Sequence, residues 1–121
     1  MPLVVSSWSY LTNLTRLVLL SSKLDEDSFS NLLVLQGLSY LELFNAYDGK
    51  RLQFPAGSFP KLRVLVILGA PQLNKVEVAE GAMECLVELV LSRCPELKFY
   101  PHGIEYLTSL ERLDIPESLM R

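Results

Sequence analysis

Apolar residues recur along this chain with a period of 24 residues. In each unit, four apolar positions follow one another with gaps of two, two and one residues, and five consecutive units carry this pattern. All twenty positions are apolar, and sixteen of them are leucine. They are Leu11, Leu14, Leu17 and Leu19; Leu35, Leu38, Leu41 and Leu43; Phe59, Leu62, Leu65 and Ile67; Met83, Leu86, Leu89 and Leu91; and Leu107, Leu110, Leu113 and Ile115. A repeat this regular predicts five copies of one structural unit.

The spacing L-x-x-L-x-L within each unit is the leucine-rich-repeat signature, for which periods of about 20–29 residues are usual. The last two leucines are two positions apart, so a strand directs both to one face and the residue between them to the other. One unit cannot bury its apolar edge alone, so stacked units share one core. A strand, a return segment and the next parallel strand make a right-handed crossover. We therefore predict an α/β fold for residues 1–121, a single domain that forms a right-handed leucine-rich-repeat solenoid of five repeats with a parallel sheet on the concave face.

The return segments between the predicted strands lack a strong helical period. Prolines interrupt them at Pro55, Pro60, Pro71, Pro95 and Pro101. We therefore expect short helical turns or irregular backbone in these segments. The exception is a helix predicted from Asp25 to Leu33, because the acidic residues at its start suit a helix N-terminus.

The residues between the inward leucines face the other side of the predicted sheet and form the surface that is left for function. The middle of this surface is apolar, with Tyr40, Phe44, Val64, Val66, Leu68 and Val90. Neighbouring strands lie about 4.8 Å apart, so these side chains form one contiguous patch in the predicted fold. Charged residues are predicted at its rim: Arg16, Glu42, Glu88, Arg112 and Asp114. We predict that these residues bind a protein partner, the alternative being scattered apolar residues without a function.

Composition and charge exclude several classes of protein. Half of the residues are hydrophobic and 21% are charged, which is not typical of a disordered chain. The net charge is −3 and the basic residues do not cluster, so nucleic acid is not an expected partner. No stretch approaches the roughly 20 apolar residues of a membrane span, and the start of the chain lacks a basic signal-peptide region. Two cysteines are too few for a disulfide framework, so we expect a soluble, cytoplasmic protein.

The sequence contains no pattern that indicates catalysis or cofactor binding. The Gly49-Lys50 pair is not part of a phosphate-binding loop, because Phe44 stands where that loop requires glycine. His102 is the only histidine and falls in an expected surface turn, so neither a His-containing metal site nor a catalytic triad is predicted. Cys94 occupies the small-residue position of its unit, and we expect it to be buried for structural reasons. We therefore expect a protein that is not an enzyme and that holds no cofactor or metal.

Three blocks of sequence follow one another in order along the chain. The first is Asn45–Leu52 with Phe59–Leu62, the second is Glu80–Leu86, and the third is Arg93–Leu97 with Pro101–Thr108. Together they resemble the C-terminal repeats of plant coiled-coil nucleotide-binding leucine-rich-repeat immune receptors, the disease resistance proteins of cereals especially. Ordered blocks of this kind are more specific than the leucine spacing alone.

The resemblance implies a protein-interaction module of plant innate immunity. In that family the repeats sense pathogen effectors or guarded host proteins and also hold the receptor's nucleotide-binding domain inactive. This sequence lacks the coiled coil and the P-loop, so nucleotide binding is not implied, and we expect a fragment of a larger receptor. A substrate-recognition fragment of an F-box ubiquitin ligase is the alternative, since its repeats can also carry cysteine in the small-residue position. A leucine-rich-repeat ectodomain would need a signal peptide and flanking cysteines.

Overall fold

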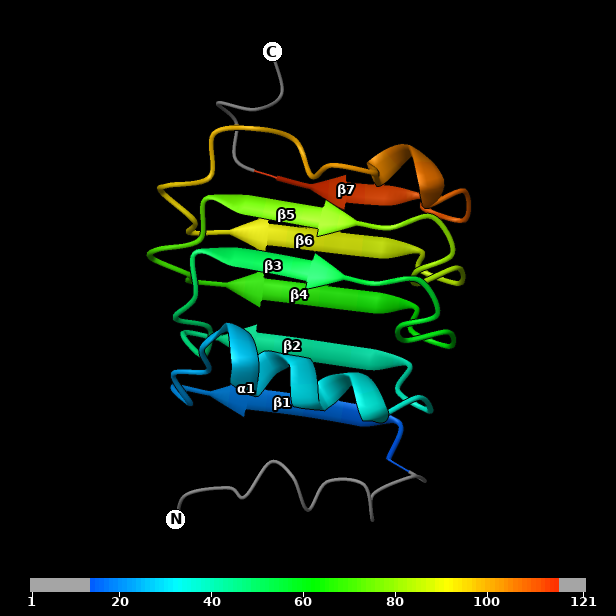
Figure 1. Cartoon of the computed structure of the whole chain (residues 1–121), viewed down its shortest axis with the longest axis horizontal. Coiled ribbons are helices and arrows are strands. Elements are labelled where there is room, and N and C mark those ends of the chain that lie inside the picture. Colours follow the sequence, from blue (N-terminus) through cyan, green and yellow to red (C-terminus); the bar gives the residue numbers. More distant parts are fainter. Residues whose placement is uncertain (1–13, 116–121) are drawn as a thin grey trace.

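Five short parallel strands form the main sheet of this protein (Figure 1). The computed structural model describes residues 14–115, so the predicted repeat position Leu11 lies outside the described residues. In spatial order the strands are β1 (Arg16–Leu20), β2 (Tyr40–Phe44), β4 (Val64–Leu68), β6 (Glu88–Ser92) and β7 (Arg112–Asp114). Each lies where the L-x-L spacing predicts a strand, and each pairs with its neighbours in the parallel direction.

The leucine spacing sets the register of the main sheet. Arg16 is opposite Tyr40, and Tyr40 is opposite Val64. Val64 is opposite Glu88, and Glu88 is opposite Arg112, so neighbouring strands are offset by 24 residues throughout. Side chains alternate between the two faces of a strand, so residues 24 positions apart lie on the same face. On β2, β4 and β6 the leucines and isoleucine of the pattern are buried and the residues between them are half-buried.

A second, smaller layer covers the inward face of the main sheet (Figure 1). It contains a two-stranded parallel sheet of β3 (Arg51–Phe54) and β5 (Lys75–Val78), the helix α1 (Glu26–Ser30), and two 3₁₀ helices, η2 (Asn31–Val34) and η3 (Ile104–Tyr106). In Figure 1 the arrows of β3 and β5 point against those of β4 and β6, because the chain reverses direction between the layers. The prediction of helical turns or irregular backbone is therefore wrong for β3 and β5.

Alternation of polar and apolar residues explains these two strands. Leu52 and Phe54 of β3 are buried, as are Val76 and Val78 of β5, while the polar residues between them are at least partly exposed. The prolines do not prevent this arrangement, because Pro55 follows the last residue of β3 and interrupts no pairing. Strands this short carry a weak period-two signal. The prolines beside them therefore led to the prediction of irregular backbone.

The predicted helix over Asp25 to Leu33 is present, but only its first part is α-helical. Asp25 is the N-cap of α1, and its carboxylate accepts a hydrogen bond from the Ser28 N–H at 2.7 Å. The α-helix ends at Ser30, and the chain continues as η2. The Ser30 hydroxyl donates to the Asp27 carbonyl at 2.6 Å. That bond competes with the α-helical ladder, so the chain tightens into 3₁₀ geometry.

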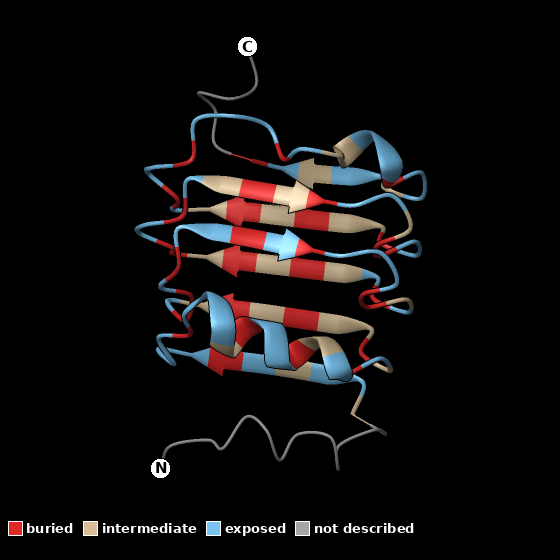
Figure 2. Ribbon diagram, in the orientation of Figure 1, coloured by how far each residue is buried: buried red, intermediate tan, exposed pale blue. Residues whose placement is uncertain are grey.

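The hydrophobic core lies between the two layers, where Figure 2 shows buried residues on both sheets. Phe29 of α1 lies at the centre of an aromatic cluster. Its ring centroid is 5.6 Å from that of Tyr47, 5.7 Å from that of Phe54 and 6.4 Å from that of Phe59, all in edge-on geometry. Such pairs add about 0.5–1.5 kcal/mol each beyond the burial of their area. The cluster therefore holds α1 on the second layer.

A residue with a left-handed backbone follows four of the main-sheet strands. Ser21, Asn45, Gly69 and Arg93 have φ angles of 53°, 50°, 83° and 58°. The N–H groups of Ser21, Asn45 and Gly69 each donate to the last carbonyl of the next strand, at 2.8–2.9 Å. At Gly69 an added Cβ would collide with the Asn45 Oδ1, so the Asn45 side chain would have to move. These turns extend the main-sheet ladder by one bond and direct the chain toward the second layer.

The described part of the chain is thus a strand-rich α/β arrangement with two parallel sheets and one α-helix. Across residues 14–115, no helix has the length and apolar content that crossing a membrane requires.

Candidate functional site

The outward face of the main sheet brings the predicted partner-binding residues together. The strand register aligns them in three ladders that cross the sheet. The first ladder is Arg16, Tyr40, Val64, Glu88 and Arg112; the second is Val18, Glu42, Val66, Val90 and Asp114; the third is Leu20, Phe44, Leu68 and Ser92. Every predicted residue lies on one of these ladders and is exposed or half-buried.

The apolar part of this face extends onto β1, beyond the predicted patch. Leu20 is 64% exposed and Val18 is 41% exposed. Leu20, Phe44 and Leu68 are neighbours on the third ladder, and Val66 lies beside them on the second. Contiguous exposed apolar side chains are typical of interaction sites, whereas single ones are not. These apolar side chains are contiguous on the face, and their role in binding stays a prediction.

Three side chains form a linked polar group at the β1–β2 end of the face. The guanidinium carbon of Arg16 lies 3.9 Å from the centroid of the Tyr40 ring, which is a cation–π contact. The Tyr40 hydroxyl donates a hydrogen bond to the Glu42 carboxylate at 2.6 Å. This hydrogen bond is the main cause of the raised pKa of Tyr40. The group fixes a positive and a negative charge beside the apolar surface.

The sequence predicted Glu42 at the rim of the apolar patch. In the structure Glu42 lies within the patch. It is opposite Val18 on one side and Val66 on the other, because β1 continues the apolar surface. The opposite end of the face carries Glu88 and Arg112, with 3.9 Å between the Arg112 Nε and the Glu88 Oε2. Exposed ion pairs of this kind contribute little to stability, so both side chains can turn toward a partner.

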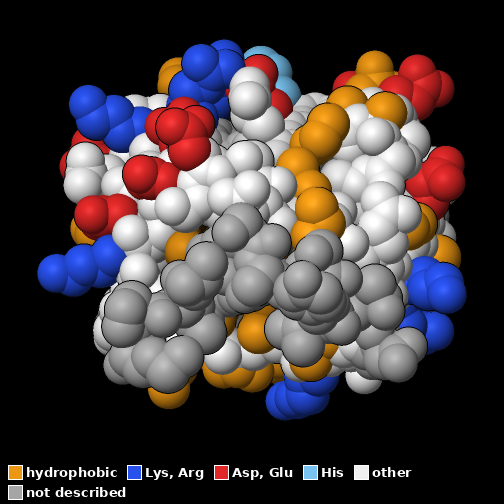
Figure 3. Space-filling view, turned by 60° about the horizontal axis from the view of Figure 1, so that its bottom comes forward, with side chains coloured by type: hydrophobic (Ala, Val, Ile, Leu, Met, Phe, Trp, Pro, Cys, Tyr) orange, Lys and Arg blue, Asp and Glu red, His pale blue; other side chains and the backbone are white. Residues whose placement is uncertain are grey.

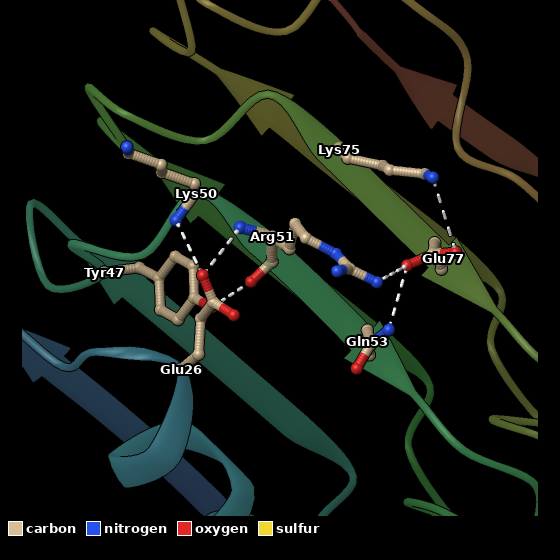
Figure 4. Close-up of polar contacts among 7 residues, drawn as sticks. All are labelled: Glu26, Tyr47, Lys50, Arg51, Gln53, Lys75 and Glu77. Carbon is tan, nitrogen blue, oxygen red and sulfur yellow. Dashed lines mark hydrogen bonds and ion pairs between the residues drawn. The ribbon is translucent and has the colours of Figure 1, made fainter.

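The second layer carries a polar network that the sequence analysis did not predict (Figure 4). At its centre, Glu77 of β5 accepts hydrogen bonds from the Gln53 Nε2 at 2.9 Å and the Arg51 Nη2 at 3.0 Å. The Lys75 Nζ lies 3.8 Å from the other carboxylate oxygen. The hydrogen bonds from Gln53 and Arg51 hold the pKa of Glu77 below its ordinary value. The network links the outward faces of β3 and β5.

Side chains also close the edge of β3 that faces α1 (Figure 4). The Glu26 carboxylate accepts hydrogen bonds from the backbone N–H groups of Lys50 at 3.2 Å and Arg51 at 3.3 Å. The Tyr47 hydroxyl donates to the Arg51 carbonyl. Burial raises the pKa of Tyr47 most, and the negative charge of Glu26 raises this pKa further. The hydroxyl therefore remains a hydrogen-bond donor. An open strand edge attracts other strands, and these contacts block that pairing at Arg51.

An open cleft of about 710 Å³ lies on the second layer. Leu33 of η2 lines it on one side, Glu105 and Tyr106 of η3 line it on another, and Gln53 and Glu77 lie between them. Figure 3 shows charged side chains of both signs toward both sides of the view, with a row of hydrophobic side chains between them. The second layer therefore contributes a recessed surface of mixed polarity.

The cysteines and the histidine have ordinary structural surroundings. Cys94 is buried as expected, its thiol donates to the Ser92 carbonyl at 3.5 Å, and burial raises the pKa of the thiol. Cys85 is exposed, and His102 is an exposed residue that pairs with Glu77 in a β-bridge. Within residues 14–115, no cluster of three or more His, Cys, Asp or Glu side chains could hold a metal ion.

One sequence signal could have revealed the network on the second layer. The segments Arg51–Phe54 and Lys75–Val78 both alternate polar and apolar residues, and they lie 24 positions apart. Extending the repeat to these segments pairs them as parallel strands and places Gln53 beside Glu77, as the structure does.

Comparison with curated proteins finds relatives among plant disease resistance proteins. The chain is 38% identical to disease resistance protein RPM1 of Arabidopsis thaliana over 112 residues, which is 92% of this chain and 12% of the relative. It is 36% identical to disease resistance RPP8-like protein 3 and to disease resistance protein RPP8 of the same plant, each over 104 residues, 85% of this chain and 12% of the relative. No protein-family model matches the chain. No solved structure matches it.

The chain thus spans about 12% of the length of these relatives. They confirm the predicted resemblance to disease resistance proteins, while the cereal affiliation stays a prediction because these relatives come from Arabidopsis thaliana. They give no support to the F-box alternative. The chain is similar to one segment of plant disease resistance proteins.

Proposed function

We propose that this chain is a leucine-rich-repeat segment of a disease resistance protein and binds a protein partner through the outward face of its main sheet. In this proposal the five units form a right-handed solenoid, the outward face is its concave side, and the chain is one domain of a larger cytoplasmic receptor. Its role is binding and not catalysis. The three aligned ladders carry the proposal, because they gather apolar side chains from neighbouring strands beside fixed charges.

The proposed partner is a pathogen effector, a guarded host protein or the nucleotide-binding domain of the receptor itself. The apolar ladders supply the area that such a partner would bury. The Arg16–Tyr40–Glu42 group supplies charges whose positions are already set, so little side-chain freedom is lost on binding. The sequence relatives support the defence setting of this contact.

Charging the centre of the apolar patch tests the proposal. Val66 is half-buried on the outward side of β4 and lies opposite Glu42, so the like charges created by Val66→Glu are expected to lower the free energy of unfolding by about 1 kcal/mol, less than a core substitution would. At an interface, the same carboxylate would be buried without a partner. Loss of a central contact costs about 2 kcal/mol or more, so binding should weaken about thirtyfold. The measurement is calorimetric titration of the 121-residue chain with the nucleotide-binding domain of a homologous receptor and, separately, with a pathogen effector.

Two further variants separate the apolar patch from its border and from the second layer. Arg112→Ala should weaken binding less than Val66→Glu, and its effect should shrink as salt is added, because exposed charges are screened. Lys50→Ala, on the second layer, should leave binding unchanged. A folded Val66→Glu protein that binds both partners as tightly as the unchanged chain would refute the proposed surface.

A further inference from the structure

Two adjacent aromatic side chains are exposed on the segment between β6 and η3. Phe99 is 71% exposed and Tyr100 is 47% exposed. Phe99 is the most exposed of the large hydrophobic side chains in the described part of the chain. Single exposed apolar residues are common, but a pair that lines one hollow is a feature of binding surfaces.

A slip in register explains why Tyr100 is exposed. With the 24-residue offset of the rest of the fold, Pro101 would stand opposite Glu77, where the strand must donate a hydrogen bond to the Val76 carbonyl. Proline has no N–H to donate. His102 takes that place instead, 25 residues after Glu77, and its N–H donates to the Val76 carbonyl at 2.8 Å.

The slip reverses which side chains face outward. A shift of one residue moves each side chain to the opposite face of a strand. Pro101 is therefore buried, and His102 is exposed. By the same count Tyr100 corresponds to Lys75, whose side chain is on the outward face of β5. The chain thus places an aromatic side chain outward where the 24-residue offset would have placed it in the core.

The hollow beside the aromatic pair carries one more lysine than carboxylates, although the chain as a whole carries a charge of −3. A hollow of about 310 Å³ is lined by Phe99, Tyr100, Lys75, Lys98 and His102, with Glu96 as its one carboxylate. Among residues 14–115, the Lys98 Nζ donates a hydrogen bond to the Pro95 carbonyl alone, at 3.1 Å, and the Lys75 Nζ lies 3.8 Å from Glu77. Neither ammonium group is tightly paired, so both can contact a ligand.

We propose that this hollow, which we call the aromatic hollow, is a second docking surface for a protein segment that carries an apolar side chain next to carboxylates. The apolar side chain packs on Phe99 and Tyr100, and the carboxylates pair with Lys75 and Lys98. The surface belongs to the second layer and is independent of the outward face of the main sheet. The neighbouring cleft favours the opposite charge, because Glu26, Glu77 and Glu105 line it against a single arginine, Arg51. An acidic segment is therefore directed to the hollow and not to the cleft.

The test is an NMR titration of the isotope-labelled 121-residue chain with short peptides. One peptide has a central leucine flanked by glutamates; in a matched peptide lysines replace the glutamates. The acidic peptide should shift the amide signals of residues 96–100 and of His102 in a saturable way and bind about tenfold more tightly than the basic one. Equal binding of the two peptides, no saturable shift, or shifts confined to the main sheet would overturn the proposal.

Variants identify the contacts within the aromatic hollow. Phe99→Ala and Lys75→Glu should each weaken binding of the acidic peptide about tenfold. Val34→Ala removes another exposed apolar side chain, 52% exposed on η2, and should leave binding unchanged. Melting temperatures close to that of the unchanged chain would show that the variants are folded. Wild-type affinity in a folded Phe99→Ala protein would refute the aromatic contact, whatever the outcome at the main sheet.

Discussion

Truncating one buried leucine tests the assignment of the two faces of the main sheet. Leu65 is 0% exposed on β4, the central strand of the main sheet, and its register partners Leu41 and Leu89 are also buried. Leu65→Ala removes about three buried carbon atoms, which corresponds to about 2.4 kcal/mol of transfer free energy at about 0.8 kcal/mol each. The cavity adds to this cost, because packed neighbours on both sides limit relaxation. We expect a loss of about 3–5 kcal/mol.

The matched control is Val64→Ala, one residue earlier on the same strand. Val64 is half-buried on the outward face, so its truncation should cost less than about 1 kcal/mol. Thermal unfolding followed by circular dichroism measures the difference. For a chain of this size, 1 kcal/mol corresponds to roughly 4 °C, so Leu65→Ala should lower the melting temperature by about 12 °C or more and Val64→Ala by about 4 °C or less. Equal shifts for the two variants would refute the inward and outward assignment.

Three further predictions concern the turns, the helix and the effect of pH. Asp25→Ala removes the N-cap of α1 and should cost about 1 kcal/mol in a denaturant titration. Gly103→Ala should lower the melting temperature more than Gly57→Ala. Both glycines have positive φ, but of the two only Gly103 has a backbone atom, the Val78 carbonyl oxygen, with which an added Cβ would collide. The lowered pKa of Glu77 stabilises the fold above the ordinary carboxylate pKa, and this contribution disappears as the pH falls through the folded-state value. The stability advantage of the unchanged chain over Glu77→Gln should therefore shrink below about pH 4, as denaturant titrations at several pH values would show.

The main sheet could be predicted from the sequence because burial there follows a strict rule. Leucines two positions apart fix which side of each strand is inside, and the 24-residue period fixes which residues are opposite one another. The ladder from Tyr40 to Val64 and Glu88 follows from these two facts alone. The predicted residues therefore lie on the outward face, with Glu42 within the apolar residues and not at their rim, while their role in binding stays a prediction. The predicted rim position of Glu42 was wrong because the prediction left the exposed Val18 outside the apolar patch.

The contacts within that face could not be predicted. The Arg16 guanidinium over the Tyr40 ring and the hydrogen bond from Tyr40 to Glu42 depend on side-chain rotamers, which a repeat pattern does not determine. The end of the α-helix at Ser30 is a similar case. A serine hydroxyl that bonds the carbonyl of the preceding turn decides between α and 3₁₀ geometry, and many sequences of the same composition would not do so.

The second layer shows why the two sides of this fold differ in how closely they follow the repeat. On the main sheet a slip of one residue would turn leucines out of the core, so the 24-residue offset is kept from Arg16 to Arg112. On the second layer the strands are four residues long, and a single missing N–H at Pro101 is enough to move the pairing to His102. The cost of that slip is low because buried Pro101 still fills the inward position. Side chains on the second layer can therefore change between facing the core and facing solvent at one residue, while the main sheet keeps its offset, and this slip is the physical reason why Tyr100 faces outward.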